Sequence, residues 1–455
     1  MTCLGEGSNY SGDLGDNLDV LSKTGRGLAL ALIVGMVCAT ACLGASSVQV
    51  IRIGVDLPLS GADGRAGSPA LNGVEFFVHQ HPSIDGFNVE VVPRDDAVGG
   101  LHNPVQGELN VKSLAADRLV LGVIGPFDSD VARLDIPIAN VAHLALISPA
   151  VSSRCLTKEP FLPASLSPSR TEITCKATGL PAPSELRPTG INNFFRLATT
   201  DELQGPAAAD YAYRNLKLRR VAALSDHEAY GQALAGGFRA RFTNLGGSVV
   251  EYRDFDPTAL LDLKVFMRKA AGDGAQAIYF GGVTANHGCV VRAQMASQFG
   301  FGEATPFLGG DGIAQDPECV RNAGPNAIGI FATVPAAFAE AIPSAQPVIS
   351  AFKAQYGNPA DYGAYTIAAY DSAGVLYAAI DRAIRAAGGK LPGRDHVINE
   401  LSATTAFKGA GGTFGFDGSG DTTLRVVSLF ESTSTDPNSQ WTWVKGVDYS
   451  ASLPY

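Results

Sequence analysis

The chain has 455 residues, of which 46% are hydrophobic and only 17% are charged. This length exceeds what one ordinary core supports and suits two lobes of roughly 150–200 residues each, and the composition excludes a disordered chain or a coiled coil. The formal net charge is −10, and because an acidic surface repels phosphate backbones, we expect no nucleic-acid partner.

The first 47 residues differ in composition from the rest of the chain. Residues 1–26 are polar and include Lys23 and Arg26 at their end, and residues 27–45 (GLALALIVGMVCATACLGA) carry no charge. Basic residues before an apolar run, with small residues after it, form the pattern of a secretory signal. We therefore expect the remainder of the chain to lie outside the cytoplasm.

The apolar run contains Ala39-Thr40-Ala41-Cys42, which resembles a bacterial lipobox. This favours a signal and tether at 1–47, with a lipid on Cys42 that anchors the mature protein to the membrane. Two alternatives stay open. The uncharged run is also long enough to span a bilayer as an uncleaved anchor, and plain secretion is the other alternative.

The cysteine count supports export. Cys3 and Cys38 lie in the segment that processing would remove, and Cys42 would carry the lipid. Four cysteines remain: Cys155, Cys175, Cys289 and Cys319. An even number outside the cytoplasm suggests two disulfides. The sequence has no CxxC motif or Cys/His cluster that would indicate a metal site.

Predicted strands and helices alternate in the first part of the chain. Hydrophobic periodicity predicts strands at 50–57, 87–93, 119–124 and 144–148. It predicts helices at 70–80, 105–116 and 130–142. Residues 119–124 (LVLGVI) are apolar throughout, which is typical of a central parallel strand. This order implies a doubly wound sheet.

A second series of the same kind follows a break in the pattern. Residues 149–190 are rich in Pro, Ser and Thr and contain Cys155 and Cys175, so we expect a surface excursion closed by a disulfide. Strands are then predicted at 220–224, 248–254, 277–281, 306–310 and 328–334, with helices at about 206–215, 232–245, 260–271 and 289–299. A helix at 365–387 and β-like segments at 412–416, 424–430 and 441–444 complete the chain. Two similar halves predict a ligand cleft at the carboxyl ends of the strands.

The sequence favours a binding protein over an enzyme. GADGRAG (61–67) is not a GxGxxG motif, and GxxxxGK[ST], GxSxG and HExxH are absent from the sequence. His79 and His81 lie on or just after the first helix, where polar roles are expected rather than metal binding. We therefore expect no catalytic residues, no metal and no cofactor.

Ten segments are specific in their order and spacing when taken together. They are IRIGVDLPLSG (51–61), LNGVEFFV (71–78), VVPRDDA (91–97), VIGPFDSDVARLDIPIANVAHLALISPA (123–150), FRLATTDELQGP (195–206), VAALSDHEAYGQALA (221–235), IYFGG (278–282), GGDG (309–312), YTIAAYDSAGVLYAAI (365–380) and GTFGFDGSGD (412–421). With this set the chain resembles the leucine/isoleucine/valine-binding proteins of bacterial ABC importers, which are type I periplasmic binding proteins. The resemblance covers nearly all of residues 48–432.

The resemblance implies an α/β fold with two doubly wound lobes joined by three crossover strands. Lobe 1 would comprise 48–200 plus 335–423, and lobe 2 would comprise 201–334 plus 424–455. The implied function is that of an extracytoplasmic receptor. It would bind an amino-acid-like solute between closing lobes and deliver it to the membrane permease of an ABC importer. The alternative is a sensor of amides or small carboxylates that acts through a separate partner.

In this family the first lobe holds the carboxylate of the solute. The resemblance places Ser129, Ala150 and Ser152 in that role. A short polar residue at a helix start can bind an anion, but Asp128 or Ser129 could also simply cap the helix. ISPAVSS (147–153) could likewise be an ordinary serine-rich loop. Asp128 and Asp130 flank the site, and we expect them to face away from the ligand or to cap the helix.

The second lobe would hold the ammonium group of the solute. The matching residues are Asp311, as the counter-ion, and Tyr230, as an aromatic that lines the pocket. The alternatives are an ordinary Asp–Gly turn and a core aromatic. Val283 and Ala66 stand where the family has two further rings. Their small size argues for a larger ligand or for a substitute such as Arg65 in that space.

We predict disulfides Cys155–Cys175 and Cys289–Cys319. The first would close the excursion at 149–190. The second would join the helix that starts near residue 289 to the turn or helix at DPECV (316–320).

Overall fold

The computed structural model describes residues 49–164, 171–257 and 260–451. These residues belong to a unit that spans Gln49–Tyr455. The predicted signal, the tether and the proposed lipid site at Cys42 lie outside the described residues.

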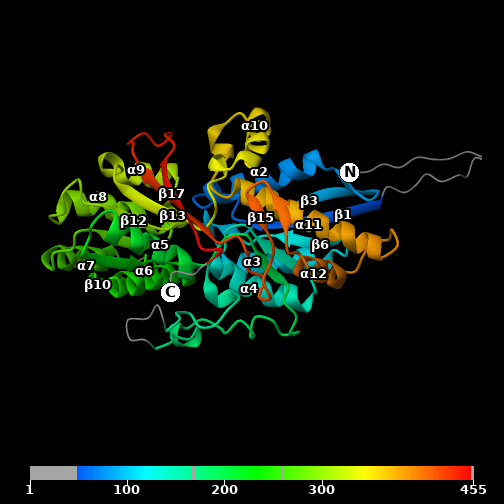
Figure 1. The fold of residues 1–455 in the computed structure, drawn as a ribbon, viewed down its shortest axis with the longest axis horizontal. Helices are drawn as coiled ribbons and strands as arrows, with labels where there is room; N and C mark the ends of the chain where they lie inside the picture. The colour runs from blue at the N-terminus through cyan, green and yellow to red at the C-terminus, as the bar shows by residue number, and fades with distance from the viewer. Residues whose placement is uncertain (1–48, 165–170, 258–259, 452–455) are drawn as a thin grey trace, which may run out of the picture. The chain divides into compact units, whose positions relative to one another are not determined.

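The first sheet has six strands in the order β2-β3-β1-β6-β7-β8 (Figure 1). Its parallel strands are β1 (Gln49–Leu57), β3 (Phe87–Asp95), β6 (Val120–Ile124), β7 (Ala145–Ser148) and β8 (Phe194–Arg196). The short β2 (Ser83–Ile84) is antiparallel at one edge. A hairpin of β4 (Ala97–Val98) and β5 (Leu101–His102) follows β3.

Helices cover both faces of this sheet. One face carries α3 (Pro104–Ala116) and α4 (Ser129–Val141), and the other carries α2 (Gly64–Gln80), α11 (Thr366–Ala386) and α12 (Arg394–Ser402). Strand β7 shows how one strand supplies apolar side chains to both faces of the sheet. Ala145 and Ile147 pack in the core with α2 and α11, and the alternate Leu144 and Leu146 pack in the core with α3 and α4. A strand that is buried on both faces needs apolar residues in both phases.

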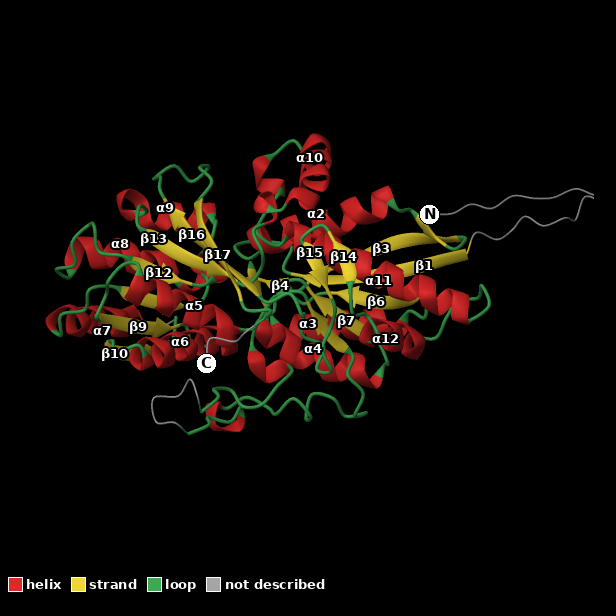
Figure 2. Ribbon diagram, viewed as in Figure 1, coloured by secondary structure: helices red, strands yellow, loops and turns green. Residues whose placement is uncertain are grey.

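The second sheet has seven strands in the order β10-β9-β11-β12-β13-β16-β17. Its parallel strands are β9 (Arg220–Ser225), β10 (Ser248–Asp254), β11 (Ile278–Gly281), β12 (Phe307–Gly309) and β13 (Ile330–Val334). Two antiparallel strands, β16 (Val426–Ser432) and β17 (Thr442–Asp448), complete it. Together the two sheets form the predicted two-lobed α/β fold (Figure 2).

The second sheet is also covered on both faces. One face carries α5 (Asp201–Arg214) and α6 (Ala229–Asn244), and the other carries α7 (Leu260–Gly272), α8 (Gly288–Gln298) and α9 (Pro317–Ala323). Tyr279 faces the first group of helices, and its neighbours Ile278 and Phe280 face the second.

The chain passes between the two sheets three times, after β8, after β13 and before β16. The passing segments lie together. The Thr199 N–H donates to the Pro335 carbonyl at 2.8 Å, and the Arg196 N–H donates to the Gly420 carbonyl at 3.1 Å. Between the second and third passages lie α10 (Gln346–Gln355), α11, α12 and a hairpin of β14 (Phe407–Gly409) and β15 (Gly412–Phe414).

Two helices begin earlier than the sequence pattern predicts. Helix α2 begins at Gly64 instead of residue 70, and α5 begins at Asp201 instead of residue 206. Glycine and proline near the helix starts are typical of loops, so the sequence pattern placed these starts too late. In the structure the glycines allow neighbouring backbone to pack closely against the helices. A Cβ atom on Gly67 would lie 1.9 Å from the Pro58 carbonyl oxygen, and one on Gly205 would lie 2.7 Å from the Leu234 carbonyl oxygen of α6.

The segment 149–190 is more than a surface excursion. Within its described part, Phe161 and Leu162 pack with both cysteines against Ala229 and Ala233 of α6. The structure joins the two cysteine pairs that we predicted. Cys155 is bonded to Cys175, and Cys289 of α8 is bonded to Cys319 of α9. Among the described helices, none combines the length and apolar character that a bilayer crossing needs.

Candidate functional site

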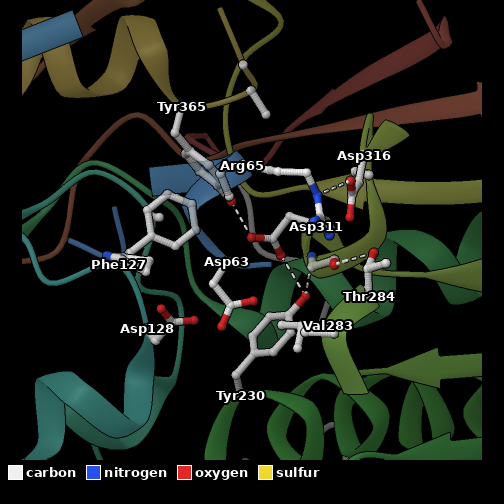
Figure 3. A pocket seen from close by; sticks show the side chains of 18 of the residues that line it. Asp63, Arg65, Phe127, Asp128, Tyr230, Val283, Thr284, Asp311, Asp316 and Tyr365 are labelled. Carbon is white, nitrogen blue, oxygen red and sulfur yellow. Dashed lines mark hydrogen bonds and ion pairs between the residues drawn. The ribbon is translucent and has the colours of Figure 1, made fainter. Parts of the chain in front are cut away.

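A cavity of about 120 Å³ lies between the two sheets (Figure 3). This is roughly ten times the volume that one water molecule requires. Its walls come from the loops that follow β1, β6 and β7 in the first sheet and β11 and β12 in the second. In the first sheet the chain runs from β1 to β3 on one side and then to β6 on the other, and a ligand crevice is expected where the strand order reverses. All five residues that the resemblance singled out line this cavity: Ser129, Ala150, Ser152, Tyr230 and Asp311.

Ser129 is the first residue of α4 and is buried in the cavity wall. Asp128 stands at the N-cap position, but its side chain makes no capping hydrogen bond. The Asp128 carboxylate therefore does not use the first N–H groups of α4 as hydrogen-bond donors. Helix N-termini carry partial positive charge and unpaired N–H groups, so this position suits a ligand carboxylate.

Ala150 and Ser152 already have partners within the protein. The Ala150 N–H donates to Ser148 Oγ at 3.2 Å, and the Ser152 carbonyl accepts from the Asp201 N–H at 3.0 Å. The Ser152 hydroxyl also lies beside the Asp201 carboxylate, where it partly opposes the burial that raises the pKa of Asp201 well above its ordinary value. These contacts shape the loop after β7.

Three neutral donors hold the Asp311 carboxylate. Gln204 Nε2 donates to Oδ1 at 2.7 Å, the Tyr230 hydroxyl donates to the same oxygen at 2.8 Å, and the Tyr365 hydroxyl donates to Oδ2. The Tyr230 hydroxyl in turn accepts from the Gly312 N–H at 3.1 Å. Burial raises the pKa of Asp311, and the three hydrogen bonds oppose that rise. These three neutral groups thus fix the direction of the carboxylate at the cavity wall.

A second group of carboxylates surrounds His102. Nδ1 of His102 lies 2.8 Å from Asp63 Oδ2 and 3.7 Å from Asp128 Oδ1, and Nε2 lies 3.4 Å from Glu228 Oε2. Burial alone would lower the pKa of His102, but the three carboxylates together hold it well above its ordinary value. We call Asp63, Asp128, Glu228 and His102 the acidic wall. Asp63 and Asp128 line the cavity itself.

The expectation for Asp128 was wrong. Its side chain neither caps α4 nor faces away, because it turns toward His102 and the cavity (Figure 3). Burial raises the pKa of Asp128 to about 7, against the opposing charge of His102. Asp130 is different. It lies outside the cavity lining and accepts a hydrogen bond from the Ala229 N–H of α6 at 3.3 Å.

The two positions without the family rings also line the cavity. These positions are Ala66 and Val283. Arg65 also lines the cavity and forms an ion pair with Asp316, with 3.3 Å between Nε and Oδ1. Arg65 belongs to α2 and Asp316 is the N-cap of α9, so this ion pair connects the two lobes. The guanidinium occupies part of the mouth and is already matched by one carboxylate.

Several residues of the site escaped the sequence analysis. Tyr365 begins one of the quoted segments, but its hydroxyl reaches Asp311 only because α11 starts beside the cavity, where its ring packs edge-to-face on Phe127 at 5.3 Å. Gln204 lies in another quoted segment. Asp63 and His102 lie 39 positions apart, and no local pattern relates them.

Comparisons with known proteins agree with this architecture. A family model described as periplasmic binding protein matches residues 50–436. An amino acid binding protein of Pseudomonas aeruginosa is 28% identical and is aligned over 75% of this chain and 81% of its own. A Leu/Ile/Val-binding protein homolog of Brucella melitensis is 29% identical over 81% of this chain and 85% of its own.

Solved structures show the same fold. A leucine binding protein of Thermotoga maritima superimposes with a TM-score of 0.68 at 24% identity and covers 88% of this chain and 99% of its own. A solute binding protein of R. palustris in complex with 4-hydroxybenzoate gives a TM-score of 0.69 at 18% identity and covers 89% of this chain and 98% of its own.

These matches confirm the predicted fold and the resemblance on which it rested. The relatives are binding proteins and not enzymes, which confirms that prediction as well. The family model covers most of the chain, and the family acts outside the cytoplasm. This chain belongs to the periplasmic binding protein family.

Proposed function

We propose that this protein is the solute receptor of an ABC importer and that it binds an amino-acid-like zwitterion in the cavity between its lobes. The observation that carries the proposal is Asp311. It is a partly buried carboxylate that three neutral donors orient at the cavity wall. A carboxylate held in this way has acceptor capacity left for an ammonium, and charge-assisted hydrogen bonds of this kind are stronger than neutral ones.

The opposite pole of the ligand would lie at the start of α4. In this arrangement the Ser129 hydroxyl and the first N–H groups of α4 bind the ligand carboxylate, because the N-terminal end of the helix favours negative charge. Ala150 and Ser152 line the same end of the cavity. Ala150 is a secondary partner, since its N–H would have to leave Ser148 Oγ to reach the ligand.

The structural neighbours include complexes with amino acids and with hydroxybenzoates. An aromatic acid has no cation to place beside Asp311, so it would leave that carboxylate buried without a counter-ion. It would also bring a negative charge toward Asp63 and Asp128. The charge of the cavity therefore supports a zwitterion over an aromatic acid.

We further propose lobe boundaries at the three passages between the sheets, with lobe 1 as 48–200 plus 335–423 and lobe 2 as 201–334 plus 424–455. A ligand held by Ser129 of one lobe and Asp311 of the other completes contacts that neither lobe makes alone. Binding would therefore favour the closed arrangement of the lobes. The lipid on Cys42 and the permease partner belong to the same proposal.

A thermal-shift screen tests the ligand class. L-leucine, L-phenylalanine, L-arginine, acetamide and 4-hydroxybenzoate should be compared, because a true ligand raises the melting temperature of the native form. We expect a rise with at least one amino acid and none with 4-hydroxybenzoate or acetamide. A rise with 4-hydroxybenzoate alone would show that the zwitterion proposal is wrong.

The anchor has its own test. Mass spectrometry of the protein made in a bacterial host should show an acylated Cys42 as the first residue. An unmodified Cys42, or a mature form that retains residues 1–41, would contradict this part of the proposal.

A further inference from the structure

The acidic wall has more negative charge than its surroundings neutralise. Three carboxylates, those of Asp63, Asp128 and Glu228, lie within 3.7 Å of one imidazole. The His102 side chain is only 6% exposed, and Asp63 and Asp128 are 13% and 17% exposed. Even a fully protonated His102 neutralises one of the three. The wall therefore keeps an excess of negative charge in a place with little solvent.

The nearest arginines do not remove this excess. Arg65 pairs with Asp316 at 3.3 Å, and Arg133 lies 3.7 Å from Asp130. One oxygen of Asp128, Oδ2, is buried without a hydrogen-bond partner among the described residues. Buried carboxylate oxygens are normally paired, so the Asp128 side chain, which lines the cavity, is short of hydrogen-bond donors.

The position of Asp128 adds a second argument. It directly precedes Ser129, which we propose as the partner of the ligand carboxylate. A ligand carboxylate at that point would meet the Asp128 carboxylate as a like charge, which is unfavourable unless a cation lies between or beside them. Figure 3 shows Asp128 well apart from the Arg65–Asp316 pair, with Asp63 between them, and no arginine is among the groups that shift the pKa of Asp128.

The cavity also has room for a second polar group. Ala66 and Val283 line it in place of the rings that the resemblance led us to expect. An aliphatic side chain such as that of leucine would reach the acidic wall without supplying a donor, and it would exclude water from Asp128. A side chain with a terminal cation would satisfy Asp128 and reduce the excess charge.

We infer that the solute is a basic amino acid, with a second cationic group that Asp63 and Asp128 bind while Asp311 binds its α-ammonium. This inference rests on the proposed function and names the substrate class of the same site. Asp63 and Asp128 act as specificity residues, because they separate cationic from neutral side chains. His102 holds the two carboxylates in place and moderates their repulsion.

A matched ligand pair tests the inference. L-arginine and L-citrulline have nearly the same shape and differ in the charge of the terminal group. Calorimetric titration of the full chain at pH 8 should give an affinity for L-arginine higher than that for L-citrulline by on the order of tenfold or more. L-ornithine and L-norvaline form a second pair, with an ammonium in place of a guanidinium.

Two substitutions test whether Asp63 and Asp128 cause the preference for the cationic ligand. Asp128→Asn and Asp63→Asn should each weaken L-arginine binding by on the order of tenfold and leave L-citrulline binding nearly unchanged. Asp395→Asn is the matched control. Asp395 also lies beside a histidine, His143, at 2.6 Å, but that pair is exposed at the far end of α4. This control should change neither affinity, and circular dichroism should show that each variant is folded.

The outcomes separate the inference from the proposed function. Equal affinity of L-arginine and L-citrulline, or wild-type L-arginine binding in both cavity variants, would overturn the inference and leave the zwitterion proposal standing. If no amino acid binds and 4-hydroxybenzoate does, both fall. Preference for the cationic member of each pair, lost in Asp128→Asn or Asp63→Asn, supports both.

Discussion

Two carboxylates on the cavity wall, Asp311 and Asp128, have opposite surroundings. Asp311 accepts hydrogen bonds from Gln204, Tyr230 and Tyr365. Asp128 has only His102 at 3.7 Å, and its second oxygen is buried without a partner among the described residues. Asp311 is thus oriented before a ligand binds, whereas Asp128 is left short of hydrogen-bond donors.

The difference separates two ways of building a binding site. Neutral donors orient Asp311 and stabilise its ionised form, so its geometry exists before the ligand arrives. The acidic wall has charge but few donors, so its stability depends on what enters the cavity. We expect Asp311 to contribute to the binding of any zwitterion, and Asp128 to discriminate among them.

The largest effect is expected for Asp311→Asn. Loss of the charge leaves the ligand ammonium buried and unpaired, which should weaken binding by about 2–5 kcal/mol. Calorimetry with L-arginine and with L-citrulline should show similar losses for both, because both have the α-ammonium. If Asp311→Asn binds an amino acid as tightly as the parent protein, Asp311 is not the ammonium partner. Asp395→Asn again serves as the control.

The pH dependence of binding should differ between cationic and neutral ligands. Burial raises the pKa of Asp128 to about 7, so below pH 7 this group must release its proton before it can pair with a cation. The affinity for L-arginine should therefore rise with pH by up to about tenfold per unit below pH 7 and level off above it. The charged and titratable groups that face Asp128 include Asp63, Asp96, His102, Asp130, Glu228 and, through Asp130, Arg133.

The carboxylates around His102 hold its pKa well above the ordinary value, which favours the protonated imidazole beside Asp128. Titrations at pH 6, 7 and 8 with L-arginine and L-citrulline test whether ionisation of Asp128 controls the binding of a cationic ligand. The affinity should change more steeply with pH for L-arginine than for L-citrulline, and Asp128→Asn should remove this difference between the ligands. An identical pH profile for the two ligands would mean that Asp128 does not discriminate between them.

A smaller effect is expected at the carboxylate end. Ser129→Ala removes one hydroxyl donor but keeps the N-terminus of α4, so binding should weaken by about 1–2 kcal/mol. The loss should be the same for L-arginine and L-citrulline. A loss as large as that of Asp311→Asn would show that the hydroxyl, and not the helix N-terminus, is the main carboxylate partner.

The smallest effect is expected for the Arg65–Asp316 pair. Its side chains are 31% and 18% exposed, and such partly exposed ion pairs typically contribute about 0.2–1 kcal/mol. A double-mutant cycle with Arg65→Ala and Asp316→Ala, with ligand affinity as the readout, isolates that coupling. A coupling above about 2 kcal/mol would identify the pair as a major contact that holds the lobes closed.

Sequence alone was sufficient for the parts of the molecule that depend on local patterns. Short apolar runs placed the central strands, since a strand such as β7 that is buried on both faces must be apolar at consecutive positions. The resemblance to a known family, carried by the quoted segments, assigned Ser129, Ala150, Ser152, Tyr230 and Asp311 to one ligand site, and all five line the cavity.

Only the tertiary structure decided which of these groups have partners. Asp311 receives donors from positions 107, 81 and 54 residues away in sequence. Whether Asp128 caps α4 or turns to His102 depends on a side-chain direction that local sequence does not specify, because both choices fit the same backbone. These contacts join segments that are far apart in sequence, and two of them, Tyr365 to Asp311 and Glu228 to His102, also join the two lobes. The charge of the cavity therefore depends on the packing of distant segments.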